Sequence, residues 1–215
     1  MNGHSHTIKA ISFDLDDTLI EEDYDKFIWY VALPKLYSQQ KGVRFEDALK
    51  FILDEYNKIP ARGEWYNVSY WLDRFGLKAD RKEFMMHYHH YIRLFPDTKP
   101  ALDALKRKYK LILITNSSRE FIDVKLESTG LEGYFDHVFS ATTDFARSKT
   151  GANIFTRIAK IVKLKPDEIL HVGNHRDFDY DKPRSIGMNA ILIDRVGKET
   201  GPEVICDLRE LLKRL

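Results

Sequence analysis

The chain has one cysteine, no long apolar run and almost no net charge. Because Cys206 has no partner in the chain, no intrachain disulfide can form, and a reducing cytoplasm is the expected compartment. No apolar run approaches the roughly 20 residues that span a bilayer, and the first residues lack the apolar core of a signal peptide. A formal net charge of +1 provides no attraction to nucleic acid or to a membrane surface. The sequence therefore argues against a secreted disulfide scaffold, a membrane protein and a nucleic-acid-binding protein.

Hydrophobic residues occupy 43% of the 215 positions, which is enough for a sizeable core. Short apolar runs predict strands over residues 8–13, 110–115, 137–140, 168–173 and 189–194, and helical patterns predict helices over about 99–108, 119–128 and 152–162. A closing amphipathic helix is predicted over 203–215. The alternation predicts an α/β fold, with a Rossmann-like parallel sheet of about five strands and helices on both faces.

Residues from about 21 to 95 follow a different pattern. Helical spacing predicts helices over about 24–41, interrupted near Pro34, and over 45–56, 65–75 and 81–94, with no strand among them. We therefore expect a Rossmann-like catalytic core, residues 1–20 and 96–215, and an inserted helical cap domain, residues 21–95. Because the insert leaves directly after the first strand, it is placed to close over a substrate as a lid.

The first predicted strand ends in a cluster of carboxylates, Asp14, Asp16 and Asp17. Unpaired carboxylates beside a core are costly, so this ending is unusual unless the charges are used. In an open parallel sheet, ligands bind beyond the carboxyl ends of the strands, and Asp14 and Asp16 stand at such an end. A purely structural alternative is an acidic turn in which Asp17 and Thr18 cap a helix.

The pattern Asp14-x-Asp16-x-Thr18 after an apolar strand resembles the first motif of the haloacid dehalogenase superfamily. Members of that superfamily are mostly phosphatases that work through an aspartyl-phosphate and Mg²⁺. The resemblance implies that Asp14 is the nucleophile. It implies that Asp16 protonates the leaving alkoxide and later takes a proton from the attacking water. It also requires three further motifs along the chain.

The second and third motifs should hold the phosphate. Thr115, with the backbone N–H of Asn116, stands after the next core strand, where the superfamily has a Ser or Thr. The alternative is that Asn116, Ser117 or Ser118 merely caps the following helix. The third motif is a lysine, and Lys149 occupies its place shortly before the predicted helix at 152–162. The next residue is Thr150, where the superfamily usually has proline. Arg147 is the fallback cation, and a solvated surface lysine is the structural alternative for Lys149.

The fourth motif should supply oxygen ligands for Mg²⁺. The chain reads Gly173-Asn174-His175-Arg176-Asp177-Phe178-Asp179-Tyr180-Asp181 and then Ile186-Gly187-Met188. Counting back from Gly187 places Asp179 at the second motif acid and Asn174 at the first, where the superfamily has Asp. The resemblance implies Asp14, Asp16 (through its carbonyl), Asn174 and Asp179 as ligands. Asn174 removes one negative charge, for which Asp177 and Asp181 are candidate replacements, and a solvated acidic turn is the structural alternative.

Substrate choice is expected in the insert. The loop at residues 60–66 combines glycine, Arg62 for an anionic group and Trp65 for packing, although a plain turn between helices fits the same letters. The resemblance implies a Mg²⁺-dependent phosphatase acting on a small phosphorylated metabolite. The alternatives are a 2-haloacid dehalogenase, a phosphomutase and a non-catalytic regulatory relative. Asn174 favours the dehalogenase, whereas Asp16 argues against it, because a departing halide needs no proton.

Overall fold

A six-stranded parallel sheet forms the centre of the computed structural model, which describes residues 7–59, 63–146, 149 and 151–215. The strand order is β3-β2-β1-β4-β5-β6. The strands are β1 (Ala10–Phe13), β2 (Lys110–Thr115), β3 (His137–Ser140), β4 (Ile169–Gly173), β5 (Asn189–Ile193) and β6 (Val204–Ile205). All five pairings are parallel, which confirms the predicted parallel α/β fold.

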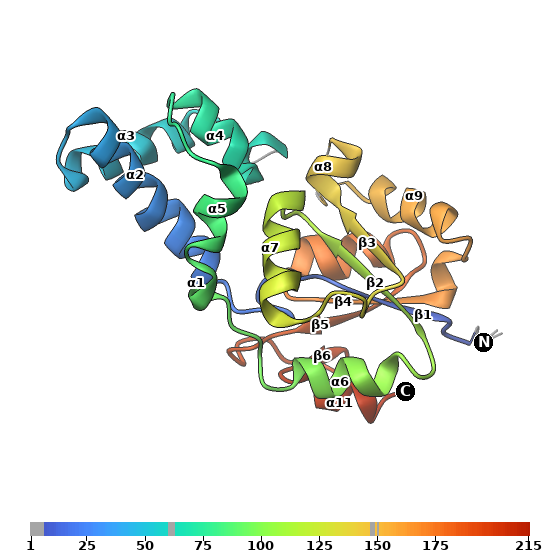
Figure 1. Cartoon of the computed structure of the whole chain (residues 1–215). Helices are drawn as coiled ribbons and strands as arrows, with labels where there is room; N and C mark the ends of the chain where they lie inside the picture. Colours follow the sequence, from blue (N-terminus) through green and yellow to red (C-terminus); the bar gives the residue numbers. More distant parts are fainter. Residues whose placement is uncertain (1–6, 60–62, 147–148, 150) are drawn as a thin grey trace.

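Helices cover both faces of the sheet, as Figure 1 shows. Alternate strand residues point to opposite faces, so Ile11 and Phe13 belong to one apolar cluster and Ala10 to another. The first cluster includes residues of α6 (Thr98–Leu105), α7 (Arg119–Thr129) and α11 (Leu208–Leu212). The second includes residues of α8 (Ala141–Phe145) and α9 (Asn153–Ile161). A short helix, α10 (Lys182–Arg184), precedes β5.

The helices between residues 21 and 95 lie together beside α7 in Figure 1. They are α1 (Asp23–Phe27), the π-helix η1 (Ile28–Ala32), α2 (Leu33–Lys41), α3 (Phe45–Asn57), the 3₁₀ turn η2 (Gly63–Tyr66), α4 (Val68–Arg74), α5 (Arg81–Met86) and the 3₁₀ turn η3 (His89–Tyr91). Their apolar cluster takes in Phe121 and Val124 of α7. Ile20 and Leu94 form an antiparallel bridge where the segment leaves and returns. The domain boundaries of this segment stay a prediction.

Two predicted helices are shorter than the patterns indicated. The helix predicted over 203–215 begins only at Leu208, because Val204 and Ile205 pair with β5 as the sixth strand. Asp207 then starts α11 through a capping box with Glu210. The helix predicted over 81–94 ends at Met86. Of the helices that the structure describes, none is long and apolar enough to cross a membrane.

Candidate active site

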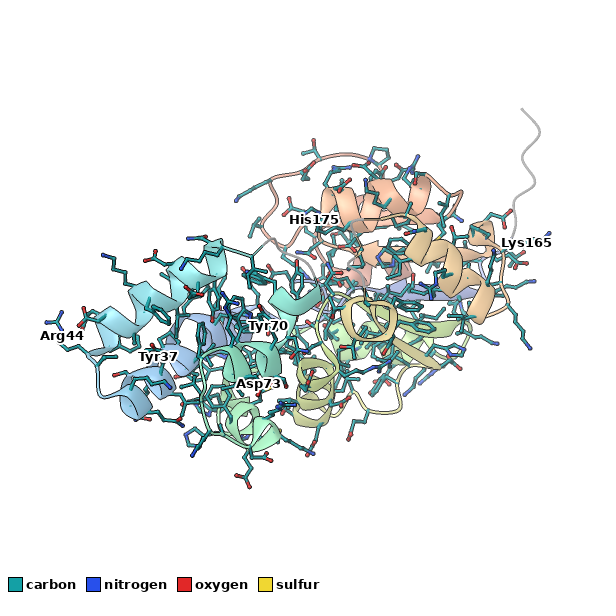
Figure 2. The ribbon with its side chains drawn as sticks, turned by 90° about the horizontal axis from the view of Figure 1, so that it is seen from above. Tyr37, Arg44, Tyr70, Asp73, Lys165 and His175 are labelled. Atoms are coloured by element: carbon teal, nitrogen blue, oxygen red, sulfur yellow. The ribbon has the colours of Figure 1, made fainter. Side chains whose placement is uncertain are left out.

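A cavity of about 350 Å³ lies where the carboxyl ends of β1, β2 and β4 meet the helical segment. The strand order reverses between β1 and β4, which is the position at which open α/β sheets bind ligands. Figure 2 labels His175, one of the lining residues, between Arg44 at one end of the molecule and Lys165 at the other. The cavity is therefore bordered both by the sheet and by the residues predicted to form a cap.

The turn after β1 directs both predicted catalytic carboxylates into the cavity. Asp14 continues the sheet through its N–H, which donates to the carbonyl of Val172 over 2.9 Å. Leu15 points into the core, and Asp14 and Asp16 on either side of it line the cavity. Asp17 follows with a φ of 53°, a left-handed conformation that aspartate tolerates better than most residues. The alternative of a helix cap is not observed, because the next helix begins only at Asp23.

Lys149 joins the first and fourth motifs. Its Nζ lies 2.5 Å from Oδ1 of Asp14 and 2.7 Å from Oδ1 of Asp179, and its side chain is 2% exposed. Burial raises the pKa of Asp14 to about 7, and the charge of Lys149 opposes this rise. Burial also acts to raise the pKa of Asp179, but Lys149 and His171 together hold that pKa far below its ordinary value. Lys149 is therefore a buried ion-pair partner and not the solvated surface lysine of the structural alternative.

Asp179 is fully enclosed beneath Lys149. Its Oδ1 lies 3.2 Å from Nε2 of His171, and its Oδ2 accepts from the backbone N–H of His175 over 3.0 Å. His171 Nδ1 in turn lies 2.8 Å from the Ser12 hydroxyl. Burial lowers the pKa of His171, which favours the neutral ring. Both Asp179 oxygens thus have partners within the chain, and the carboxylate is positioned to orient Lys149.

The end of β2 contributes the predicted phosphate-binding residues. Thr115 and Asn116 both line the cavity. The Asn116 side chain accepts from the backbone N–H of Lys149 over 2.8 Å, so it also holds the lysine segment. Ser118 occupies the N-cap position of α7 but forms no side-chain cap bond. Helix capping by that serine is therefore not what places these polar residues here.

Three potential oxygen ligands for a cation converge at the edge of the cavity. One end of the Asn174 side-chain amide lies 3.3 Å from Oδ2 of Asp14 and 3.2 Å from the carbonyl oxygen of Asp16. If that end is the nitrogen, it donates two hydrogen bonds. If it is the oxygen, three oxygens face one another, and a cation between them offsets their repulsion. A carboxylate, a carbonyl and an amide oxygen are hard ligands of the type that Mg²⁺ prefers. The residues present therefore fit Mg²⁺.

This ligand set does not consist of acidic side chains alone. Among the described residues, no group of three or more His, Cys, Asp or Glu side chains is arranged to hold a metal. The two spare acids of the loop do not change this. Asp177 forms a half-exposed ion pair with Lys182, and neither Asp177 nor Asp181 is among the residues that line the cavity. The loss of charge at Asn174 is thus not compensated by these two residues within the described cavity.

Comparison with known proteins matches residues 8–181 to the family model of haloacid dehalogenase-like hydrolases. The chain belongs to this family. It is 28% identical to the GMP/IMP nucleotidase YrfG of Escherichia coli, over 78% of this chain and 74% of that protein. It is 26% identical to the glyceraldehyde 3-phosphate phosphatase of Pyrococcus furiosus, over 97% of this chain and 93% of that protein. A crystal structure of a phosphatase of this superfamily from Thermococcus onnurineus matches with a TM-score of 0.84 and 27% identity, covering 96% of this chain and 97% of that one.

The haloacid dehalogenase-like site contains a second buried lysine that the sequence reasoning missed. Lys125 of α7 is 0% exposed and binds Oδ1 of Asp16 and Oδ2 of Asp25, while the Ser117 hydroxyl donates to Oδ2 of Asp16 over 2.6 Å. Burial acts to raise the pKa of Asp16, but the charge and hydrogen bond of Lys125 together with the hydrogen bonds from its other partners hold that pKa below its ordinary value. Burial, together with the charge of Asp16, raises the pKa of Asp25 to about 8. The sequence did contain an indication of this buried lysine: Lys125 follows Phe121 by one helical turn, which places it on the buried face of α7.

The wall of the hydrolase cavity opposite the sheet is aromatic. Its rings come from η1, η2 and α7, and they are Trp29, Tyr30, Trp65, Tyr66 and Phe121. Trp65 packs 5.9 Å from Trp29, and its carbonyl accepts from the indole N–H of Trp71 over 3.1 Å. The predicted residue Trp65 therefore reaches the cavity. Arg62, Arg147 and Thr150 lie outside the described residues.

Proposed function

We propose that this hydrolase is a Mg²⁺-dependent phosphatase that cleaves a small phosphorylated metabolite through an aspartyl-phosphate on Asp14. The observation that carries the proposal is the contact of 2.5 Å between Lys149 Nζ and Oδ1 of Asp14, at the carboxyl ends of the strands. A lysine at this place neutralises both the carboxylate that attacks and the phosphate that is attacked. The two phosphatases and the nucleotidase among its relatives support the same reaction class.

The two carboxylates at the end of β1 have different roles in the proposed reaction. Asp14 attacks phosphorus and forms an acyl-phosphate while the bond to the leaving oxygen breaks. Asp16 gives its proton to that oxygen, and then removes a proton from the water that hydrolyses the acyl-phosphate. The negative charge of a bound phosphate opposes the effect of Lys125 and favours the protonated form of Asp16 needed in the first step. Thr115, the backbone N–H of Asn116 and Lys149 bind the remaining phosphoryl oxygens.

Asp14, the carbonyl of Asp16 and Asn174 would hold Mg²⁺. Asp179, which was also predicted as a ligand, forms an ion pair with Lys149. The bound ion supplies positive charge that offsets the crowding of carboxylates and phosphate. Asn174 contributes an oxygen but no charge. We therefore propose that this site binds Mg²⁺ more weakly than one with aspartate at the same position.

Residues 21–95 act as the cap in this proposal, and substrate choice lies in their contribution to the cavity. The aromatic wall supports this assignment, because flat apolar rings select the part of a substrate that departs with the leaving oxygen. Trp65 is the described specificity residue, with Arg62 as its predicted partner. A 2-haloacid dehalogenase remains the second candidate on account of Asn174. Asp16 and its two hydrogen-bond partners count against it, because halide departure requires no acid.

The test is turnover of p-nitrophenyl phosphate and of a panel that includes nucleoside monophosphates, glyceraldehyde 3-phosphate and 2-haloacids, each with Mg²⁺ and with a chelator. We expect Mg²⁺-dependent release of phosphate and no release of halide. Halide release without metal would favour the dehalogenase. Transfer of phosphate between two positions of a sugar, without net release, would indicate a phosphomutase. Inactivity on every compound would favour a regulatory relative.

A further inference from the structure

Lys125 lies between two carboxylates from different parts of the chain. Asp16 comes from the turn after β1, Asp25 from α1 and Lys125 from α7. The lysine is 0% exposed, whereas the carboxylate side chains keep 26% and 19% of their surface and both line the cavity. Isolated burial of an ammonium group is very unfavourable, so Lys125 depends on these two partners.

The contacts around Lys125 leave its ammonium group little freedom. Oδ2 of Asp25 lies 2.5 Å from Nζ, and the rings of Phe121 and Tyr24 lie 5.2 and 6.0 Å from it. The group is thus held between Asp16, Asp25 and two aromatic rings. Removing Asp25 would take away one of its two carboxyl partners and allow the lysine to shift.

Asp16 is in turn held through both of its oxygens. Lys125 binds Oδ1, and the Ser117 hydroxyl binds Oδ2 over 2.6 Å. Two bonds at the two ends of a carboxylate define its plane as well as its position. Proton transfer requires a donor within hydrogen-bond reach of the leaving oxygen, so this orientation bears directly on the rate.

We propose that Lys125 and Asp25 are positioning residues, which hold the Asp16 carboxyl in the orientation from which it delivers its proton to the leaving oxygen. The inference rests on the proposed phosphatase function. Asp25 acts through Lys125, and Lys125 acts through Asp16. Because Asp25 belongs to the predicted cap, the orientation of Asp16 depends on a side chain from outside the sheet.

The test compares Asp25→Asn with wild type on two aryl phosphates of nearly the same shape, p-nitrophenyl phosphate and phenyl phosphate, with Mg²⁺ present. Phenolate leaves less readily, so its release depends more on protonation. We expect kcat/KM, which reports the steps up to release of the leaving group, to fall by at least about 10-fold for phenyl phosphate and by less than about 3-fold for p-nitrophenyl phosphate. Lys125→Met, once a melting curve shows that it is folded, should also lower the activity on phenyl phosphate relative to that on p-nitrophenyl phosphate. Asp23→Asn, at an exposed position on α1, is the matched control and should leave both rates unchanged.

A double variant separates positioning from a general structural effect. In an Asp16→Asn background, Asp25→Asn should lower kcat/KM for phenyl phosphate by less than about a further 2-fold, because the carboxyl group that it positions is already lost. Equal losses on both substrates, or a full additional loss in the Asp16→Asn background, would overturn the positioning role. Absence of wild-type turnover on either phosphate ester would instead overturn the proposed function itself.

Discussion

Gly173 lies so close to Asp179 that a Cβ atom at position 173 would be 2.5 Å from Cγ of the aspartate. The same hypothetical atom would be 2.7 Å from Oδ2, which accepts from the N–H of His175. The glycine at the end of β4 is thus required by close approach of a side chain. It allows Asp179 to reach Lys149, and through Lys149 it affects Asp14.

Gly173→Ala should therefore impair the site. We expect Asp179 to be displaced, kcat to fall by at least about 10-fold, and the free energy of unfolding to decrease by about 1–3 kcal/mol from overpacking. Steady-state kinetics and denaturant titration measure the two effects. In an Asp179→Gly background the same change should cost less stability, because Cβ, Cγ and Oδ2 of the aspartate, all of which lie too close to the added Cβ, are absent. Fully additive losses would show that the two residues do not interact.

Asp14→Asn tests the nucleophile. The variant keeps the shape of the side chain but removes the attacking charge, so we expect kcat to fall by at least about three orders of magnitude. Acid-quenched wild-type protein should carry phosphate on Asp14, identified by mass spectrometry of its peptides. Phosphate trapped on another residue would refute the assignment.

Asn174→Asp tests the proposed metal site. A carboxylate here would add a negative charge near Mg²⁺ in a partly desolvated cavity, so the Kd for Mg²⁺ should fall at least severalfold, or by roughly 1 kcal/mol or more. Titration calorimetry measures this directly, and the Mg²⁺ dependence of activity should shift in parallel. Asp179→Ala should raise the Mg²⁺ requirement, because Lys149 would then pair with Asp14 alone and compete more strongly with the ion for that carboxylate. Asp177→Ala, at an acid outside the cavity, is the control. Loss of metal dependence in Asp177→Ala would assign the ligand to Asp177.

Stability in the absence of metal should fall as the pH rises from about 6.5 to about 8. Folding raises the pKa of Asp14 to about 7 and that of Asp25 to about 8, from 3.8. Between pH 3.8 and these raised values the folded state binds more protons than the unfolded state, so the free energy of unfolding decreases as the pH rises through that interval and levels off above about pH 8. His171, whose pKa is lowered from 6.5, acts in the opposite direction mainly below this range. Melting curves with a chelator measure the trend, and Asp25→Asn should make it shallower. An unchanged slope in that variant would contradict the pKa shift of Asp25.

The sequence by itself determined the parallel fold and the chain segments that meet at the cavity. Apolar runs specify strands because both faces of a parallel sheet are buried, and the polar residues after them must then gather at one edge. Asp14, Thr115 and Asn174 could be placed in this way, whereas the place of Lys149 came from its position in the third motif of the family resemblance. The short strand β6 was missed, because Val204 and Ile205 resemble the start of the amphipathic helix that follows them.

Only the tertiary structure decided which side chains contact one another within that edge. Lys125 lies 109 positions from Asp16 and 100 from Asp25, and Lys149 lies 135 from Asp14. Contacts over such separations depend on how α1 and α7 pack, and no local pattern contains that information. A lysine on the buried face of a helix indicates that an acidic partner exists, but the fold alone supplies Asp16 and Asp25 as its partners. The same reason explains why Asp179, predicted as a metal ligand from its spacing, has both oxygens bonded within the chain by Lys149, His171 and the backbone of His175.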